Sequence, residues 1–320
     1  MLTKNILVAI ALVVLVVNVF SGHNVGDLLP NANADLNRSL RSEPTRAAPS
    51  PRSPQQKEKL LVVDQDDIYQ YRGIWDSSPI VIEQYKLVFF TIPKVGCTTF
   101  KQLFRRMMGH RNWRSQDGRL MLPHNPFKNG LKYLYNFPLE QANEILTSPL
   151  YTRAIFVRDP KLRFLSAFLD KALSNNGLYI REKCCPATGD CVEQAQTLEG
   201  FLQLAESCQD THWMPQSERL DQKYWKYIDF VGHLETAEED TRCLLERIGA
   251  WEEFGRFGWG KNGNSSIFEN PADAGGHATH SRWEVWKWYN QAAERQVESF
   301  YKQDYDNALF NFTRTRLVQH

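Results

Sequence analysis

Two segments of the chain share one pattern, in which an apolar stretch runs into a polar turn and then into a helix-like stretch. The first segment is Phe89–Phe100 and the second is Ala154–Ser166. In a parallel α/β sheet, a connection of this kind presents the N-terminus of a helix to an anion. Because the pattern occurs twice and each turn carries a cationic residue, we predict one ligand with two separate anionic groups.

The first turn carries the groups that bind an oxyanion. Backbone N–H groups of residues 95–99 would surround the anion, Thr98 and Thr99 would add hydroxyl donors, and Lys94 would supply a mobile charge. The turn is not a Walker A loop, because its lysine precedes Gly96 and the pattern G-x-x-x-x-G-K-[ST] does not occur. An ordinary connection with a surface lysine is the alternative.

The second turn combines an arginine with a serine. Arg158 closes a buried strand, and Ser166 lies on the second turn of a helix for which Asp159 is the N-cap and Pro160 the first residue. A guanidinium group forms a planar fork that suits phosphate, and a serine hydroxyl completes such a contact. The alternative is that Arg158 pairs with Asp159 or Asp170.

The composition is that of one large domain. The chain has 320 residues, of which 42% are apolar, and these are enough to form a sizeable core. The formal net charge is +1, so bulk charge predicts neither nucleic-acid binding nor membrane-surface binding. A local cluster must therefore bind any acidic partner. The basic residues Arg105 and Arg106 either face an acidic glycan or form a solvated helix face.

The N-terminal region predicts entry into the secretory pathway. Ile6–Val17 is an unbroken run of twelve apolar residues, which is long for a signal-peptide core and short for a membrane span. We interpret residues 1–4 as a cytoplasmic tail, 5–20 as an uncleaved signal-anchor helix and 21–60 as a disordered stem. Residues 61–320 then form a lumenal domain. A cleaved signal peptide is the alternative.

The cysteines favour disulfide bonds. In an oxidising lumen several of the six cysteines should pair. Cys184 and Cys185 lie in a loop-like segment with Cys191, so a local bridge to Cys191 would close that segment. Zinc is the competing interpretation, but the cluster contains no Cys-x-x-Cys pair and has no nearby histidine.

Strand-like and helix-like stretches alternate along the chain, which predicts an α/β fold with a central parallel sheet flanked by helices. The strand-like stretches are Leu60–Val63, Ile80–Ile92, Ala154–Val157 and Tyr227–Val231. The helix-like stretches are Cys97–Met108, Leu139–Leu146, Pro160–Leu173, Thr197–Glu206, Thr236–Ile248 and Arg282–Phe300. Residues 255–276 are expected to form a loop.

The two anion-binding segments resemble a known family. Residues 93–100, Pro-Lys-Val-Gly-Cys-Thr-Thr-Phe, are similar to the 5′-phosphosulfate loop of Golgi carbohydrate sulfotransferases, in the group that includes the HNK-1, chondroitin and dermatan 4-O enzymes. Residues 158–168 are similar to the 3′-phosphate site of that family. Further similar motifs are residues 212–216, 231–236 and 301–310.

The resemblance implies a reaction. The donor would be 3′-phosphoadenosine 5′-phosphosulfate, the acceptor would be a glycan hydroxyl, and neither a metal nor nucleic acid would take part. A single P-loop-like α/β domain would lie in the Golgi lumen behind a single-pass type II anchor. Lys94 would offset the charge that develops on the leaving phosphate. The donor-binding residues would be Pro93, Lys94, Val95, Gly96, Cys97, Thr98, Thr99, Arg158, Arg163 and Ser166.

A histidine should take the proton from the acceptor hydroxyl, because its pKa suits this role near neutral pH. His124 occupies the place at which the relatives carry a histidine, and we predict it as the base. The alternative is a loop histidine that only bonds to the backbone. His212 is the second candidate, and together with Trp213 it is predicted to contribute to the acceptor site.

Other interpretations stay open. The family pattern has a closely spaced cysteine pair after Trp213, which this chain lacks, and the segment 184–191 is a candidate replacement for that constraint. The triplet Asp64-Gln65-Asp66 would suit a metal-dependent glycosyltransferase, although its position ahead of the core sheet favours an exposed turn. A non-catalytic glycan-binding protein is a further alternative.

Overall fold

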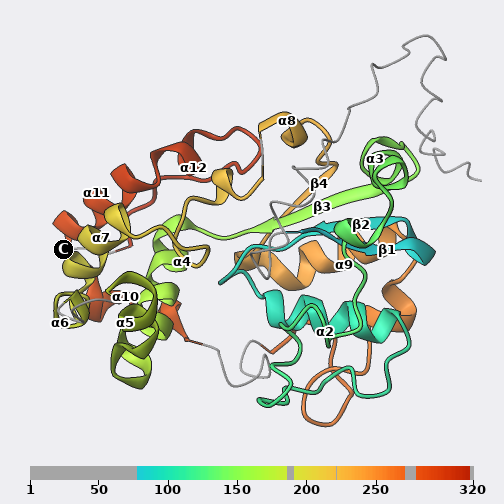
Figure 1. Cartoon of the computed structure of the whole chain (residues 1–320), viewed down its shortest axis with the longest axis horizontal. Coiled ribbons are helices and arrows are strands. Elements are labelled where there is room, and N and C mark those ends of the chain that lie inside the picture. The colour runs from blue at the N-terminus through green and yellow to red at the C-terminus, as the bar shows by residue number, and fades with distance from the viewer. Residues whose placement is uncertain (1–77, 186–190, 221, 271–278, 318–320) are drawn as a thin grey trace, which may run out of the picture. The chain divides into compact units, whose positions relative to one another are not determined.

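A four-stranded sheet forms the centre of the protein, for which a computed structural model describes residues 78–185, 191–220, 222–270 and 279–317. The strands lie in the order β1 (Ile80–Ile82), β2 (Leu87–Phe90), β3 (Thr152–Val157) and β4 (Phe230–His233) (Figure 1). Strands β2, β3 and β4 are parallel, and β1 runs antiparallel to β2.

The predicted α/β class with a central sheet and flanking helices is confirmed, but the sheet is mixed rather than wholly parallel. The sequence suggested one strand-like region over Ile80–Ile92, and the structure divides it into β1 and β2 at the short 3₁₀ turn Glu83–Tyr85. A connection of this length reverses the chain direction, because a parallel neighbour requires a crossover of a dozen or more residues.

Helices follow the strands and pack around them. Their bounds are α2 (Cys97–Met107), α3 (Leu139–Thr147), α4 (Pro160–Ala167), α5 (Leu178–Cys184), α6 (Cys191–Gln194), α7 (Leu198–Ser207), α8 (Gln222–Trp225), α9 (Ala237–Arg247), α10 (Ser281–Trp288), α11 (Gln291–Phe300) and α12 (Lys302–Asp306). The predicted cap of α4 is confirmed, because the Asp159 side chain accepts a hydrogen bond from the Leu162 N–H at 3.0 Å and Pro160 begins the helix.

The predicted helix over Arg282–Phe300 is wrong in one respect, because the structure breaks it into α10 and α11. The break lies at Asn290, whose side chain accepts a hydrogen bond from the Ala293 N–H at 2.8 Å and so caps α11. An asparagine side chain that bonds to nearby backbone competes with a continuous helix. The predicted helix over Pro160–Leu173 also changes character, because Phe168–Leu173 is a π-helix.

Two apolar cores lie in the domain. One surrounds the sheet, where rings from β2, β3 and α2 pack together, and Phe100 and Phe156 have centroids 4.5 Å apart. The other joins α4, α7, α10 and α11, which Figure 1 shows gathered away from β1 and β2. The strands β2 and β3 are apolar almost throughout because helices or loops cover them on both faces.

The basic residues after the first turn have structural roles, so both alternatives for them are wrong. Arg105 is buried, and its guanidinium donates to the Asn129 carbonyl and to the Asn112 side chain. The half-buried Arg106 donates to the carbonyls of Phe254 and Phe257. Carbonyl groups of the domain thus already accept hydrogen bonds from both guanidinium groups.

The N-terminal predictions lie outside the described residues. These predictions are the tail, the anchor, the stem, the strand over Leu60–Val63 and the triplet Asp64-Gln65-Asp66. Within the residues that the structure describes, no helix is both long enough and apolar enough to cross a membrane.

We predict that Gly232→Ala weakens the packing of β4 against β3. Gly232 pairs with Phe156, and a Cβ at this glycine would lie 2.5 Å from the Phe156 ring. Overpacking of this kind costs about 1–3 kcal/mol, which urea unfolding measures. Adding Phe156→Leu to Gly232→Ala should recover part of the loss, because the smaller side chain gives room. Strictly additive effects of the two substitutions would contradict the proposed clash.

Candidate active site

A cavity of about 1480 Å³ lies where the carboxyl ends of β2 and β3 meet the second helical core. Its walls include residues from both anion-binding segments, among them Lys94, Thr98, Arg158 and Ser166. Because β2 and β3 are parallel neighbours, the turns that follow them lie at the same edge of the sheet. The sequence prediction that the two segments converge is therefore confirmed.

The turn after β2 is shaped for an anion. Lys94 and Gly96 both have left-handed backbone angles, with φ of 69° and 70°. The first hydrogen bond back into α2 comes from the Phe100 N–H to the Gly96 carbonyl at 3.1 Å, and no side chain caps the helix. The N–H groups of Thr98 and Thr99, in the first turn of α2, have no partner within the helix and lie beside the hydroxyls of the same residues.

Glycine suits position 96 for a second reason. A Cβ there would lie 3.2 Å from the side chains of Leu234 and Phe268, in addition to its strained φ. The Val95 side chain points into the core, so any contact of this residue with a ligand is through its backbone. Pro93, Cys97 and the two threonines, which the sequence predicts as donor-binding residues, line the cavity.

Arg158 presents a half-buried cation to the cavity. Its guanidinium donates to the Lys94 carbonyl at 3.1 Å and to the Ser281 hydroxyl at 2.6 Å, which are neutral partners. Burial lowers the pKa of Arg158, because a charge is costly away from water. Beside it, the Ser166 hydroxyl lies 2.8 Å from the Thr279 hydroxyl. An anion at this position would supply the opposite charge and replace hydroxyl contacts with stronger ones.

The backbone of Arg158 is held by a glutamine. The Gln216 side chain accepts from the Arg158 N–H at 2.9 Å and donates to the Arg158 carbonyl at 2.8 Å. Asp304, which is fully buried on α12, in turn accepts from the Gln216 N–H at 2.8 Å and the Ser217 N–H at 2.8 Å. This chain of bonds holds the Arg158 backbone in place directly after the end of β3.

Lys94 forms an ion pair with Asp170 across the cavity wall. Its Nζ lies 2.9 Å from Asp170 Oδ2, and Lys171 Nζ lies 3.1 Å from the same oxygen. Burial lowers the pKa of Lys94, and the attraction of Asp170 opposes this change. For Asp170, burial raises the pKa, but Lys94 and Lys171 outweigh it and bring the pKa down to about 2.

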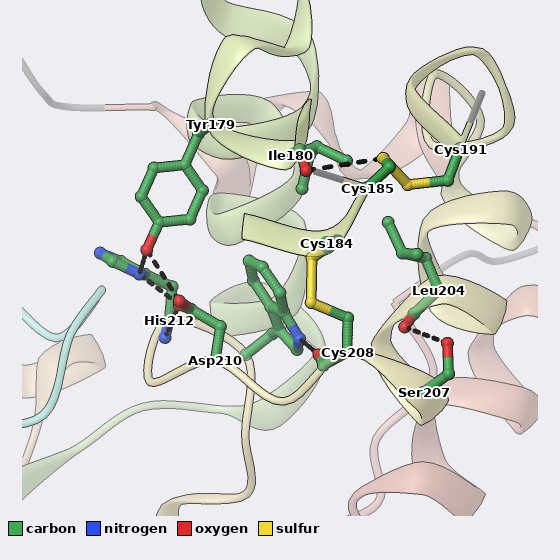
Figure 2. The surroundings of a disulfide bond; sticks show 11 residues. Tyr179, Ile180, Cys184, Cys185, Cys191, Leu204, Ser207, Cys208, Asp210 and His212 are labelled. Atoms are coloured by element: carbon green, nitrogen blue, oxygen red, sulfur yellow. Dashed lines mark hydrogen bonds and ion pairs between the residues drawn. A yellow bond between two sulfur atoms is a disulfide. The ribbon is translucent and has the colours of Figure 1, made fainter. Parts of the chain in front are cut away.

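Three histidines line the cavity, His124, His212 and His280, and the first two are the predicted base candidates. His124 Nε2 lies 3.0 Å from the Thr98 hydroxyl, at the start of α2. His212 Nδ1 lies 2.6 Å from Asp210 Oδ1, and the Tyr179 hydroxyl donates to Asp210 Oδ2 at 2.7 Å. Figure 2 shows the side chains of Tyr179 and Asp210 directed at the ring of His212. Both predicted base candidates thus lie at the site.

Arg163 and Trp213 do not reach the cavity, which corrects the roles predicted for them. Arg163 is fully buried, and its guanidinium donates to the carbonyls of Pro93 at 3.0 Å, Thr211 at 2.9 Å and Met214 at 2.7 Å. Trp213 is also fully buried, and its indole N–H donates to the Cys208 carbonyl. The N–H groups of both side chains already donate to backbone carbonyls. Both residues therefore hold the loops of the site in position.

Family comparison agrees with the geometry. A sequence profile of the sulfotransferase family matches residues 78–313. The chain belongs to the sulfotransferase family. This is the family that the pair of segments at neighbouring strand ends indicated. The structure describes most of the matched residues.

Curated relatives of this sulfotransferase are carbohydrate sulfotransferases. Human carbohydrate sulfotransferase 9 is 30% identical over 190 residues, mouse carbohydrate sulfotransferase 11 is 23% identical over 256, and mouse carbohydrate sulfotransferase 14 is 29% identical over 182. The alignments cover 54%, 73% and 53% of this chain and 41%, 66% and 46% of those relatives. No solved structure matches the chain at a significant level.

Two disulfides stand beside the cavity of this sulfotransferase. Cys185 pairs with Cys191, which confirms the predicted local bridge and excludes zinc as the reason for this cluster. Cys184 pairs with Cys208, which the sequence did not indicate. Across the described ranges, no group of His, Cys, Asp and Glu side chains has an arrangement that would hold a metal ion.

Sequence reasoning missed several residues of the site. Asp210 had one signal, its position two residues before His212. Tyr179, Thr279 and Ser281 had no signal, because they come from segments remote in sequence that only the fold brings to the cavity. Asp170 was expected, if anywhere, beside Arg158, and it pairs with Lys94 instead.

We predict that the ion pair of Asp170 stabilises the protein near neutral pH and that this stabilisation is lost at acidic pH. The pKa of this carboxyl is about 2 in the folded protein, below its ordinary value of 3.8, so the charged group stabilises the fold at pH values above 3.8. The contribution is lost as the pH falls from 3.8 to 2. The side chain is only 20% exposed, so the effect should reach about 2 kcal/mol.

Urea unfolding of the wild type and of Asp170→Asn at a series of pH values measures this contribution. The unfolding free energy of the wild type should fall by about 2 kcal/mol more than that of the variant across the acidic interval. Glu252→Gln, which removes an exposed pair with Arg256, is the matched control and should follow the wild type. Parallel curves for wild type and Asp170→Asn would contradict the prediction.

Proposed function

We propose that the protein transfers a sulfuryl group from 3′-phosphoadenosine 5′-phosphosulfate to a hydroxyl of a carbohydrate. The observation that carries the proposal is the pair of cationic sites in one cavity, at the ends of β2 and β3. A nucleotide with a phosphosulfate at one end and a 3′-phosphate at the other matches that pair. A ligand with a single phosphate would occupy only one of these two sites, whereas Lys94 and Arg158 lie on separate turns of the same cavity.

The residues present fit this donor. The phosphosulfate lies at the turn after β2, on the N–H groups of α2 and the hydroxyls of Thr98 and Thr99, beside Lys94. The 3′-phosphate lies at Arg158 and Ser166, whose present hydrogen-bond partners are neutral. Arg163 holds the Pro93 carbonyl and thereby the shape of the turn.

The reaction follows from where charge appears. The acceptor oxygen attacks sulfur in line, the bond from sulfur to the bridging phosphate oxygen breaks, and the electron pair stays on that oxygen. Lys94 offsets the developing negative charge, after exchanging part of its pairing with Asp170. A histidine takes the acceptor proton. The sequence favours His124 for this role, and both His124 and His212 line the cavity.

The acceptor and the location belong to the same proposal. The relatives are named carbohydrate sulfotransferases, which supports a glycan as the acceptor. Residues 1–4, 5–20 and 21–60 act as tail, signal anchor and stem of a single-pass type II protein, with the catalytic domain in the Golgi lumen. Two disulfides in the described residues fit an oxidising compartment.

We predict that substitutions of Lys94 and Arg158 separate catalysis from donor binding. Lys94→Ala should lower kcat by about 100-fold to 1,000-fold, because it removes stabilisation of the leaving group. Arg158→Ala should weaken the binding of adenosine 3′,5′-bisphosphate by about 10-fold to 100-fold, because a charged hydrogen bond to phosphate is lost. Transfer of labelled sulfate to a panel of desulfated glycans measures the rate, and calorimetry measures binding.

A control variant removes a lysine without touching the cavity. Lys132 is exposed and pairs with Glu83 outside the site, so Lys132→Ala should keep both rate and affinity. Adenosine 3′,5′-bisphosphate should also raise the melting temperature of the wild type. If this nucleotide neither binds nor raises the melting temperature, the proposed function is wrong, and manganese-dependent transfer from a sugar nucleotide would favour a glycosyltransferase.

A further inference from the structure

We infer that His212, oriented by Asp210 and Tyr179, takes the proton from the acceptor hydroxyl, and that the Cys184–Cys208 disulfide holds this group together. The inference rests on the proposed sulfuryl transfer and names the acceptor side of the same cavity. It assigns the base to His212 in place of His124, which the sequence favoured.

The hydrogen bonds of His212 fix its tautomer. Asp210 Oδ1 lies 2.6 Å from the ring Nδ1 and also accepts from the His212 backbone N–H at 2.9 Å. A carboxylate can only accept, so Nδ1 carries the hydrogen and Nε2 carries the lone pair. An imidazole held in this way by a carboxylate has the orientation of a general base, and the carboxylate stabilises the cation that forms.

Tyr179 completes the group from another element. Its hydroxyl donates to Asp210 Oδ2 at 2.7 Å and lies 3.2 Å from His212 Nδ1. Burial raises the pKa of Asp210, but the hydrogen bonds from His212 and Tyr179 outweigh it and lower the pKa overall. Asp210 therefore stays ionised and can hold the imidazole.

The group lies beside the reacting centre. Asp210, His212 and Tyr179 line the same cavity as Lys94, and Lys171 links them, with its Nζ 4.6 Å from the Tyr179 ring centroid and 3.1 Å from Asp170. Burial lowers the pKa of His212, Asp210 opposes this change, and the charges of Lys171 and Lys94 lower it further. A lowered pKa favours the neutral imidazole, which is the form that a base requires.

The contacts of His124 suit a different role. Its Nε2 bonds to the Thr98 hydroxyl at 3.0 Å, and Thr98 is one of the predicted ligands of the phosphosulfate. In this interpretation His124 orients a donor-binding group at the start of α2. A positioning role predicts a change in donor affinity, whereas a base predicts a change in turnover.

A disulfide joins the two elements that make the group. Tyr179 and Cys184 lie on α5, whereas Cys208 begins the loop that carries Asp210 and His212, and the two sulfurs bond (Figure 2). The same loop is fixed at Thr211 by Arg163. The second disulfide, Cys185 to Cys191, joins α5 to α6 instead and offers a matched control.

The proposed step balances in atoms and charge. His212 Nε2 accepts the proton of the acceptor hydroxyl while that oxygen bonds to sulfur and the sulfur bond to the phosphate oxygen breaks. The products are the sulfate ester, adenosine 3′,5′-bisphosphate and an imidazolium beside Asp210. The imidazolium then returns its proton to water.

The test compares His212→Asn with His124→Asn in full-length protein. His212→Asn should lower kcat for transfer of labelled sulfate to desulfated glycans by at least about 100-fold, with the Kd of adenosine 3′,5′-bisphosphate unchanged. His124→Asn should weaken that binding and reduce kcat far less. Wild-type turnover in His212→Asn, or loss of turnover in His124→Asn with intact nucleotide binding, would overturn the inference. Failure of the wild type to bind the nucleotide would instead refute the proposed function.

The pH profile separates orientation from mere structural support. Asp210→Asn removes the carboxylate that raises the pKa of His212, so the acid limb of kcat/KM should move to lower pH while kcat falls. Tyr179→Phe removes only a hydroxyl that stabilises the Asp210 charge, so the acid limb should move to higher pH. Acid limbs unchanged in both variants would refute the role given to this pair.

The two disulfides test the scaffold. Cys184→Ser with Cys208→Ser should lower kcat about tenfold or more, because Tyr179 is no longer tied to the loop of His212, and should leave nucleotide binding unchanged. Cys185→Ser with Cys191→Ser should keep kcat near the wild-type value, measured well below its melting temperature. Equal kcat in the two double variants would show that the Cys184–Cys208 bond does not hold the base.

Discussion

The geometry of the cavity depends on one buried guanidinium, that of Arg163. It donates to the carbonyl of Pro93 in the turn after β2 and to the carbonyls of Thr211 and Met214 on either side of His212. Three backbone carbonyls from two distant segments thus converge on one rigid fork. Without it the Pro93 carbonyl, whose bond to Arg163 is buried, would lose this donor, and the turn after β2 would lose its link through Arg163 to the loop of His212.

The donor wall is the side of the cavity formed by Lys94, Thr98, Arg158 and Ser166. Much of it could be predicted from the sequence because residues close together in the chain determine its structure. The apolar runs that became β2 and β3, the glycine at position 96 and the Asp159 cap of α4 are each explained by residues within a few positions. Two turns after neighbouring parallel strands must then meet at one edge of the sheet. The convergence of Lys94 and Arg158 needed no further information.

The opposite side, the acceptor wall formed by Tyr179, Asp210 and His212, could not be predicted in the same way. Tyr179 comes from α5 and Asp210 from a loop after α7, and only tertiary packing brings them to His212. Arg163 and Trp213 lie in motifs that suggested ligand contact. Both side chains are buried, however, and their N–H groups donate to backbone carbonyls instead. The cause of the break at Asn290 is local, because its side chain caps α11. The helix-like pattern of the sequence continues through this position and so predicted one long helix.

The two walls also differ in what holds them together. Backbone hydrogen bonds and buried side chains hold the donor wall, whereas both disulfides of the described residues lie on the side of α5 and His212. Recombinant protein from a reducing cytosol would therefore keep the fold of the nucleotide site and lose the covalent ties of the other wall. Retention on a nucleotide column or a thermal shift with nucleotide would then report on one wall of the cavity only, and a preparation that passes both checks would still have the lower kcat expected without the Cys184–Cys208 bond. Expression through an oxidising compartment is the condition under which the whole cavity can be studied.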